Sequence, residues 1–301
     1  MRILMINHFP LEGSGSGTYT KNLAMQLVEC GYEVCVVAPE NTLDFPQYKG
    51  VRIHPVYFTP ENPVDNPPSP QQALPFNFPC FTTHPASTVA FSDLDDQQLA
   101  AYTSAFRAAL EEEIEQFTPD IIHGQHVWIL PALAADLGVP LVLTAHGTDL
   151  MGYDKWPDMR HYAETAMQAC VKVICVSRDN ERLVRDTFPD QADKIVAMSN
   201  GYNPAIFFPA SVETSNVLAH YGLSYAGQSI VLFAGKLTNF KGVDVFLDAA
   251  ALYESQLPNT MTLLAGDGEL RTPLEEQAQH ICEKWESAAP EVYAAIMEKL
   301  M

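Results

Sequence analysis

Two lysines in the segment AGKLTNFKG (234–242) stand where an α/β fold can bind an anion. Lys236 follows an apolar strand pattern, and Lys241 stands with Gly242 at the start of a predicted helix. Two cations beside a helix N-terminus suit a diphosphate, because each ammonium is a point charge and the helix dipole adds to them. The alternative is a pair of solvated surface charges. The pair is conspicuous, since the chain has 17 Lys and Arg residues against 37 Asp and Glu.

Glycines accompany these lysines. Gly235 precedes Lys236, and Gly266 and Gly268 follow the next apolar strand in the segment TMTLLAGDGE. A residue without a Cβ lets a ligand approach the backbone closely. We therefore expect all three glycines to contribute to the same binding site.

A polar cluster, AHGTDL (145–150), directly follows the apolar strand LVLT. Open α/β sheets bind ligands at the carboxyl ends of their strands. His146 could donate a hydrogen bond to a sugar hydroxyl, and Thr148 and Asp149 could add others. The alternative is that Thr148 or Asp149 caps the following helix, which leaves the histidine unexplained.

A glycine-rich loop, GSGSGTYT (13–20), opens the first predicted helix. The backbone at Gly15, Ser16 and Gly17 suits an approaching phosphate or sugar hydroxyl. An NAD fingerprint would place G-x-G-x-x-G directly after the first strand, whereas here residues 8–12 intervene and the spacing is G-x-G-x-G. Glu40 follows the second strand, as a ribose-binding carboxylate would. The glycine-rich loop and Glu40 therefore leave an NAD-dependent oxidoreductase as an alternative, and this alternative rests on these two features alone.

Alternating strands and helices must position these segments. Apolar runs such as RILMIN, YEVCVVAP, PLVLTAHG and VKVICVS alternate with helical patterns. Strands that are apolar throughout indicate a parallel sheet covered on both faces. A chain of 301 residues is long enough for two domains. The sequence predicts an α/β protein with two Rossmann-like domains and parallel sheets, of which the second has only two recognisable strands.

The stretch between Tyr57 and Asp93 is rich in proline and aromatic residues. Such a long segment without regular structure is usually functional or disordered. Phe76, Phe78 and Phe81 argue against disorder. We interpret the stretch as a lid or an acceptor-side loop, with a flexible insertion as the alternative.

The composition limits the partners and the compartment. A net charge of −20 disfavours nucleic acid and anionic lipid. No stretch approaches the roughly 18 apolar residues that span a bilayer, so no transmembrane segment is expected. The six cysteines form no CxxC pair and resemble the reduced thiols of a cytoplasmic protein.

Taken together and in order, these segments resemble glycosyltransferase family 4, retaining enzymes with the GT-B fold. The resemblance includes the glycine-rich loop, HGTD, VICVS, the linker SNGYNPAIFFP, F-x-G-K-L followed by K-G, and L-x-G-x-G. HGTDL with the GSG loop also looks like the subgroup that transfers N-acetylglucosamine to malate. The resemblance covers most of the chain.

The resemblance implies a nucleotide-sugar donor in the cleft between two domains, a UDP sugar ahead of a GDP sugar. His146, Lys236 and Lys241 would be the catalytic residues, with His146 on the transferred sugar and both lysines on the diphosphate. The family commonly has arginine where Lys236 stands. The acceptor would be a small molecule or lipid-linked. No metal or further cofactor is expected, and a homodimer is compatible with the pattern. The expected donor-binding residues are Gly15, Ser16, Gly17, Thr148, Asp149, Gly235, Gly266 and Gly268.

The chain departs from the family after GDGELRTPLEEQAQ. The family continues with more strands and a segment E-x-F-G-x-x-x-x-E, which this chain lacks. We therefore expect an N-terminal domain over 1–203, a partial donor-side domain over 204–282, and a C-terminal helix over 283–301 that packs on the first domain. The alternative function is a catalytically inactive remnant that binds a nucleotide sugar or acts as a scaffold.

Overall fold

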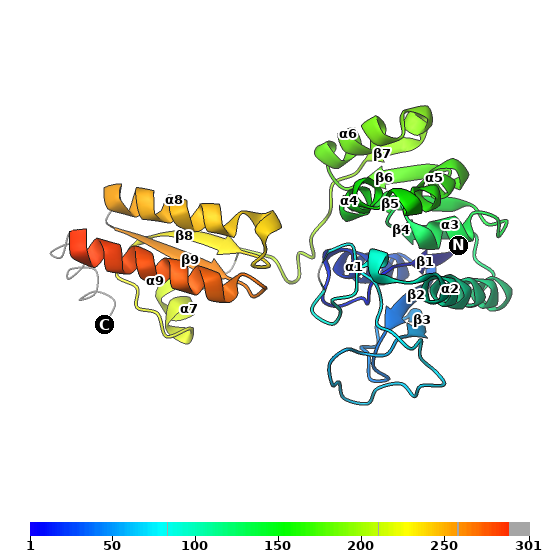
Figure 1. The fold of residues 1–301 in the computed structure, drawn as a ribbon, viewed down its shortest axis with the longest axis horizontal. Helices are drawn as coiled ribbons and strands as arrows, with labels where there is room; N and C mark the ends of the chain where they lie inside the picture. The colour runs from blue at the N-terminus through cyan, green and yellow to red at the C-terminus, as the bar shows by residue number, and fades with distance from the viewer. Residues whose placement is uncertain (83, 210, 258, 289–301) are drawn as a thin grey trace. The chain divides into compact units, whose positions relative to one another are not determined.

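The computed structural model describes residues 1–82, 84–209, 211–257 and 259–288, which form two compact units (Figure 1). The division lies between Phe207 and Phe208. The sequence-based boundary between residues 203 and 204 lies four residues earlier, in the same linker segment.

The N-terminal unit is built on a seven-stranded sheet in which every neighbouring pair is parallel. The strands are β1 (Arg2–Ile6), β2 (Glu33–Glu40), β3 (Val51–Tyr57), β4 (Ile121–Gln125), β5 (Leu141–Ala145), β6 (Lys172–Cys175) and β7 (Ile195–Ala197). Their order is β3-β2-β1-β4-β5-β6-β7. The direction of winding reverses between β1 and β4, which is where such sheets bind ligands.

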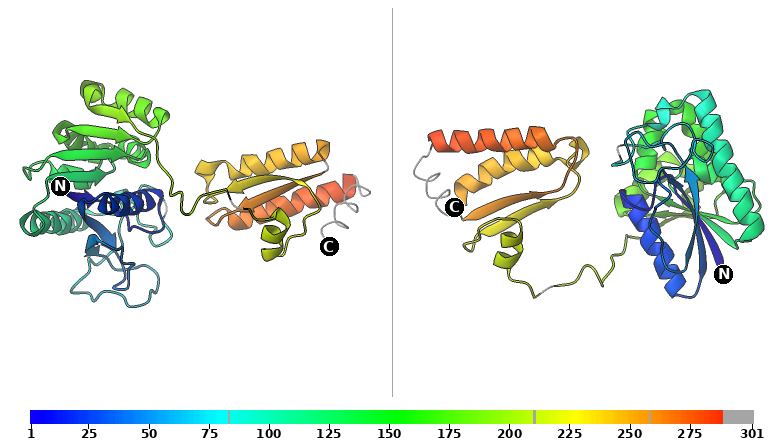
Figure 2. Two further views of the ribbon diagram at one scale, coloured as in Figure 1. Left: turned by 180° about the vertical axis from the view of Figure 1, so that it is seen from behind. Right: turned by 90° about the horizontal axis from the view of Figure 1, so that it is seen from below.

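Helices cover both faces of this sheet. They are α1 (Gly15–Glu29), α2 (Asp96–Gln116), α3 (Ile129–Ala134), α4 (Thr148–Lys155), α5 (Arg160–Ala169) and α6 (Arg178–Thr187), with short 3-10 helices at Phe91–Asp93, Pro157–Met159 and Pro189–Lys194. Figure 2 shows α1 on one face and α2 on the other. Along β1, Ile3 and Met5 pack into the core beneath α1, while Leu4 and Ile6 pack into the core beneath α2. The prediction of a parallel sheet buried on both faces is confirmed.

The proline- and phenylalanine-rich stretch after β3 is anchored in the core. Phe58, Phe78 and Phe81 are at most 5% exposed and pack with Phe91 and the aromatic residues of α2. These contacts favour an ordered loop over the flexible insertion.

The C-terminal unit has a parallel pair of strands, β8 (Ser229–Ala234) and β9 (Thr260–Ala265), as the sequence predicts. Its helices are α7 (Thr214–His220), α8 (Val243–Gln256) and α9 (Arg271–Ala288), with a 3-10 helix at Asn239–Lys241. Its small buried core consists of Leu237, Val243, Leu247 and Leu274. The helix α9 continues across the predicted boundary at residue 282, and the rest of that predicted helix, 289–301, lies outside the described residues.

Two further expectations concern membranes and thiols. Within the described part of the chain, no helix has the length and apolar character needed to cross a membrane. Cys35, Cys80, Cys170 and Cys175 are buried free thiols, as expected, whereas Cys30 is exposed.

Candidate functional site

The loops after β4 and β5 are tied together by one buried carboxylate. Asp149, near the start of α4, has a side chain that is 0% exposed. Its Oδ2 accepts hydrogen bonds from the backbone N–H groups of Val127 at 2.8 Å and His146 at 3.4 Å. Its Oδ1 accepts from Gly147 at 2.7 Å and Leu150 at 3.2 Å. The structure therefore gives Asp149 a positioning role beneath the candidate site. Because its carboxylate is buried, it does not make the direct contact with the donor that the sequence predicts.

His146 is partly exposed at this edge of the sheet. Its Nε2 lies 2.9 Å from Oε1 of Gln125, and its ring makes a T-shaped contact with Tyr19, with ring centroids 5.2 Å apart. Burial, and then the neighbouring His126, lower the pKa of His146, which keeps the imidazole neutral at pH 7. A neutral imidazole held by Gln125, on a backbone that donates to the Asp149 carboxylate, can exchange hydrogen bonds with a hydroxyl group. Thr148, the first residue of α4, is half-buried beside it.

Several buried polar side chains lie beneath His146, and the sequence analysis did not identify them. Nδ1 of His8 lies 2.8 Å from the Tyr102 hydroxyl. His126 has a left-handed backbone (φ 70°), and burial lowers its pKa to about 3. Its Nδ1, the Asn7 amide and Nε2 of Gln125 are buried without a hydrogen-bond partner in the described structure. The only signal in the sequence is the position of these residues at the ends of β1 and β4.

The glycine-rich loop divides into residues that a ligand can approach and residues that pack inward. Ser14 caps α1, and its hydroxyl accepts from the N–H of Gly17 at 3.0 Å. At Gly15, a Cβ would meet no atom within 4 Å, whereas at Gly17 it would lie 2.2 Å from the carbonyl oxygen of Pro10. Ser16 is buried. Gly15 therefore stays open to a ligand, while Gly17 is required by the packing of α1 on the preceding loop.

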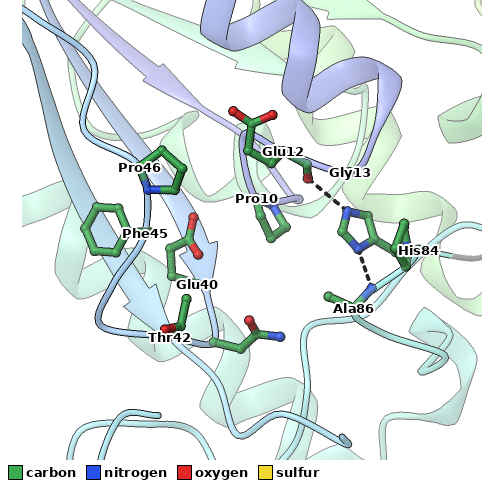
Figure 3. Close-up of a pocket in the computed structure, with 11 residues that line it drawn as sticks. Pro10, Glu12, Gly13, Glu40, Thr42, Phe45, Pro46, His84 and Ala86 are labelled. Atoms are coloured by element: carbon green, nitrogen blue, oxygen red, sulfur yellow. Dashed lines mark hydrogen bonds between the residues drawn. The ribbon is translucent and has the colours of Figure 1, made fainter. Parts of the chain in front are cut away.

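Beside this loop is a pocket of about 240 Å³ that the sequence analysis missed (Figure 3). It lies between the loop after β1, the end of β2 and the segment around His84. Burial, and then the charge of Glu12, raise the pKa of Glu40 to about 7. Burial acts to raise the pKa of Glu12 as well, but hydrogen bonds from Lys21 at 2.9 Å and Tyr48 at 2.7 Å outweigh it and lower that pKa.

In the C-terminal unit, the two predicted lysines both precede the start of α8. Lys236 is half-buried after β8, and Lys241 is exposed at the end of the 3-10 helix. Gly242 has a left-handed backbone (φ 62°) and no side chain caps α8. The first N–H groups of a helix have no partner within it, so this end can accept an anion.

The glycines of this unit serve its own packing. A Cβ at Gly266 would lie 1.8 Å from the carbonyl oxygen of Gly235, and one at Gly268 would lie 2.4 Å from that of Leu237. The space that we expected for a ligand at these two glycines is thus filled by backbone. At Gly235 the nearest atoms belong to Phe233 at 3.5 Å.

A parallel, doubly wound sheet with polar loops at its switch point defines a Rossmann-like ligand-binding unit. The family model "Glycosyl transferase 4-like domain" matches residues 14–201, and the chain belongs to that family. The resemblance to glycosyltransferase family 4 is thereby confirmed.

Curated relatives agree with this family, and solved structures share the fold. The chain is similar to the D-inositol 3-phosphate glycosyltransferases of Nocardiopsis dassonvillei (26% identity) and Mycolicibacterium vanbaalenii (32% identity), each over 58% of this chain. It spans only 43% and 41% of those proteins. The fold is similar to that of sucrose-phosphate synthase from Thermosynechococcus elongatus, with a TM-score of 0.63, 16% identity and coverage of 96% of this chain and 68% of the other. It is also similar to HepE of Anabaena in complex with UDP, with a TM-score of 0.58, 15% identity and coverage of 93% and 66%. These neighbours are GT-B glycosyltransferases, and the C-terminal part of this chain is shorter.

Proposed function

We propose that this chain transfers a sugar from a nucleotide-sugar donor to an acceptor hydroxyl with retention of anomeric configuration. The observation that carries the proposal is the family match over residues 14–201, together with His146 held at the switch point by Gln125 and Asp149. Four buried free thiols support a cytoplasmic setting.

The proposed donor is a UDP sugar, and its diphosphate binds to the C-terminal unit. Lys236, Lys241 and the N-terminus of α8, which no side chain caps, supply positive charge in this segment. Solved neighbours support the uridine nucleotide, since HepE is in complex with UDP and with UDP and glucose. A lysine at 236 offers a point charge in place of the bidentate fork of an arginine, so the diphosphate is held less rigidly.

In the proposed reaction, the bond between the anomeric carbon and the diphosphate oxygen breaks. The acceptor oxygen forms its new bond on the same face of the sugar, and its proton passes to the leaving diphosphate. Catalysis then consists mainly of positioning and of stabilising the charge on the leaving group. His146, which is neutral, orients the transferred sugar through a hydroxyl group. The acceptor is a small or lipid-linked molecule.

Calorimetric titration of the full chain with UDP, GDP and their sugars tests the donor. We expect UDP to bind more tightly than GDP. The double variant Lys236→Ala/Lys241→Ala should bind UDP about tenfold or more weakly, because two charge-assisted contacts are lost. The exposed Lys49→Ala serves as the control and should bind like the parent. Absence of binding by every nucleotide, or equal affinity in the double variant, would contradict this donor site.

A further inference from the structure

The pocket between the loop after β1 and the end of β2 contains a buried hydrogen-bond donor that has no acceptor in the described structure. Asn41 is 7% exposed and lines the pocket, and its Nδ2 has no hydrogen-bond partner in the described structure. An amide N–H that is buried and unpaired costs free energy unless a ligand or water accepts its hydrogen bond. Next to it, no described residue donates to the carboxylate of Glu40, which also lines the pocket. The pocket therefore presents one unused donor and one unused acceptor side by side in the sequence.

The other groups that line the pocket are already engaged. The carboxylate of Glu12 is bound by Lys21 and Tyr48. The ring of His84 accepts from the N–H of Ala86 at 3.1 Å and faces the carbonyl oxygen of Glu12 at 3.2 Å, as the dashed lines in Figure 3 show. With Nδ1 accepting, Nε2 carries the proton, so the imidazole is uncharged. No Lys or Arg is among the residues that line the pocket in the described chain.

The walls of the pocket are apolar rings. Phe45 and Pro46 lie on one side of Glu40 and Pro10 in Figure 3, and His84 lies on the other. Such rings suit the C–H face of a saturated ring. A volume of about 240 Å³ is at the small end for ligand sites, which suits a single sugar or cyclitol ring.

We propose that this pocket binds the acceptor, and that the acceptor is a polyhydroxylated ring without a phosphate or carboxylate group. One hydroxyl donates to Glu40 and another hydroxyl accepts from Asn41. The described lining offers no Lys or Arg to bind an anionic group, and the Glu40 carboxylate repels such a group when it is ionised. This inference rests on the proposed function. It gives this chain an uncharged acceptor, whereas the relatives are named for an inositol phosphate. It likewise excludes malate.

The experiment measures binding of neutral rings and of their anionic counterparts to the full chain by ¹H–¹⁵N NMR. The probes are hexoses and inositols, the monophosphate ester of each, and malate, and the ring signals of His84 report binding in the pocket. We expect at least one neutral ring to shift these signals and its phosphate ester to bind about tenfold or more weakly. In Glu40→Gln this difference should shrink, and Asn41→Leu should lose affinity for the neutral ring. Glu33→Gln, at the exposed opposite end of β2, is the matched control and should change neither.

Each outcome bears on one proposal. The pocket proposal is overturned if a phosphate ester or malate binds as tightly as the best neutral ring, or if no neutral ring binds. It is also overturned if Glu33→Gln changes the preference as much as Glu40→Gln does. UDP binding, measured separately on the same samples, tests the proposed function. A chain that binds UDP but no neutral ring keeps the glycosyltransferase proposal and loses this one.

Discussion

Burial of His123 in the core of the N-terminal unit should make the stability of this unit depend on pH. It lies on the central strand β4, is 8% exposed, and its Nε2 lies 2.8 Å from the hydroxyl of Thr144. Burial lowers the pKa of His123 from 6.5 to about 4. The folded chain therefore keeps this imidazole neutral over a range of pH in which the unfolded chain protonates it. As a result, the contribution of His123 to stability is complete above pH 6.5 and is lost as the pH falls from 6.5 towards 4.

The magnitude follows from the linkage relation. Consider one histidine that stays neutral in the folded chain but has the usual pKa of about 6.5 in the unfolded chain. Lowering the pH from 7 to 5 then lowers the free energy of unfolding by about 2 kcal/mol. Glu40, whose pKa is raised to about 7, acts in the opposite direction. Its contribution is the same in a variant that lacks only His123, so it cancels in the comparison. On moving from pH 7 to pH 5, His123→Gln should lose about 2 kcal/mol less stability than the parent.

Urea unfolding of the full chain at pH 7, 6 and 5 measures this difference. Trp128 and Trp156 are buried in the N-terminal unit, so tryptophan fluorescence follows its unfolding. The exposed His161→Gln is the control in the same unit and should show the parental pH dependence. If His123→Gln and the parent lose equal stability between pH 7 and pH 5, the reasoning from burial is refuted, whatever the absolute stability of the variant.

Three substitutions test the packing of the site. Gly17→Ala should destabilise the N-terminal unit by about 1–3 kcal/mol, because its Cβ would lie 2.2 Å from a carbonyl oxygen. Gly15→Ala should leave the melting temperature unchanged or raise it, since its Cβ meets nothing within 4 Å and alanine favours a helix. Equal melting temperatures for these two variants would contradict the division of the glycine-rich loop. Asp149→Asn should lower the free energy of unfolding by about 3 kcal/mol, because an amide cannot replace a carboxylate that accepts four backbone hydrogen bonds; an unchanged urea midpoint would contradict the positioning role.

The sequence by itself determined the sheet and the place of the candidate site. Runs such as ILMI (3–6) are apolar at consecutive positions, which indicates that both faces of each strand are buried, as they are in a parallel sheet with helices on both sides. The carboxyl ends of such strands share one edge, which is why the sequence predicts a candidate site at HGTD. The start of α8 directly after Gly242 was equally predictable, since both the helical pattern and the glycine are local.

Only the tertiary structure decided what each of these residues does there. Gly17, Gly266 and Gly268 are glycines because another part of the backbone approaches them, and this approach depends on how distant loops pack. The sequence shows Asp149 as one more polar residue in a loop, while the fold buries its carboxylate against Val127 on the neighbouring loop. The pocket joins Glu12, Glu40 and His84, of which the first and last are 72 positions apart. No local pattern encodes that proximity, because it arises from the order of the strands and from the burial of the aromatic residues after β3.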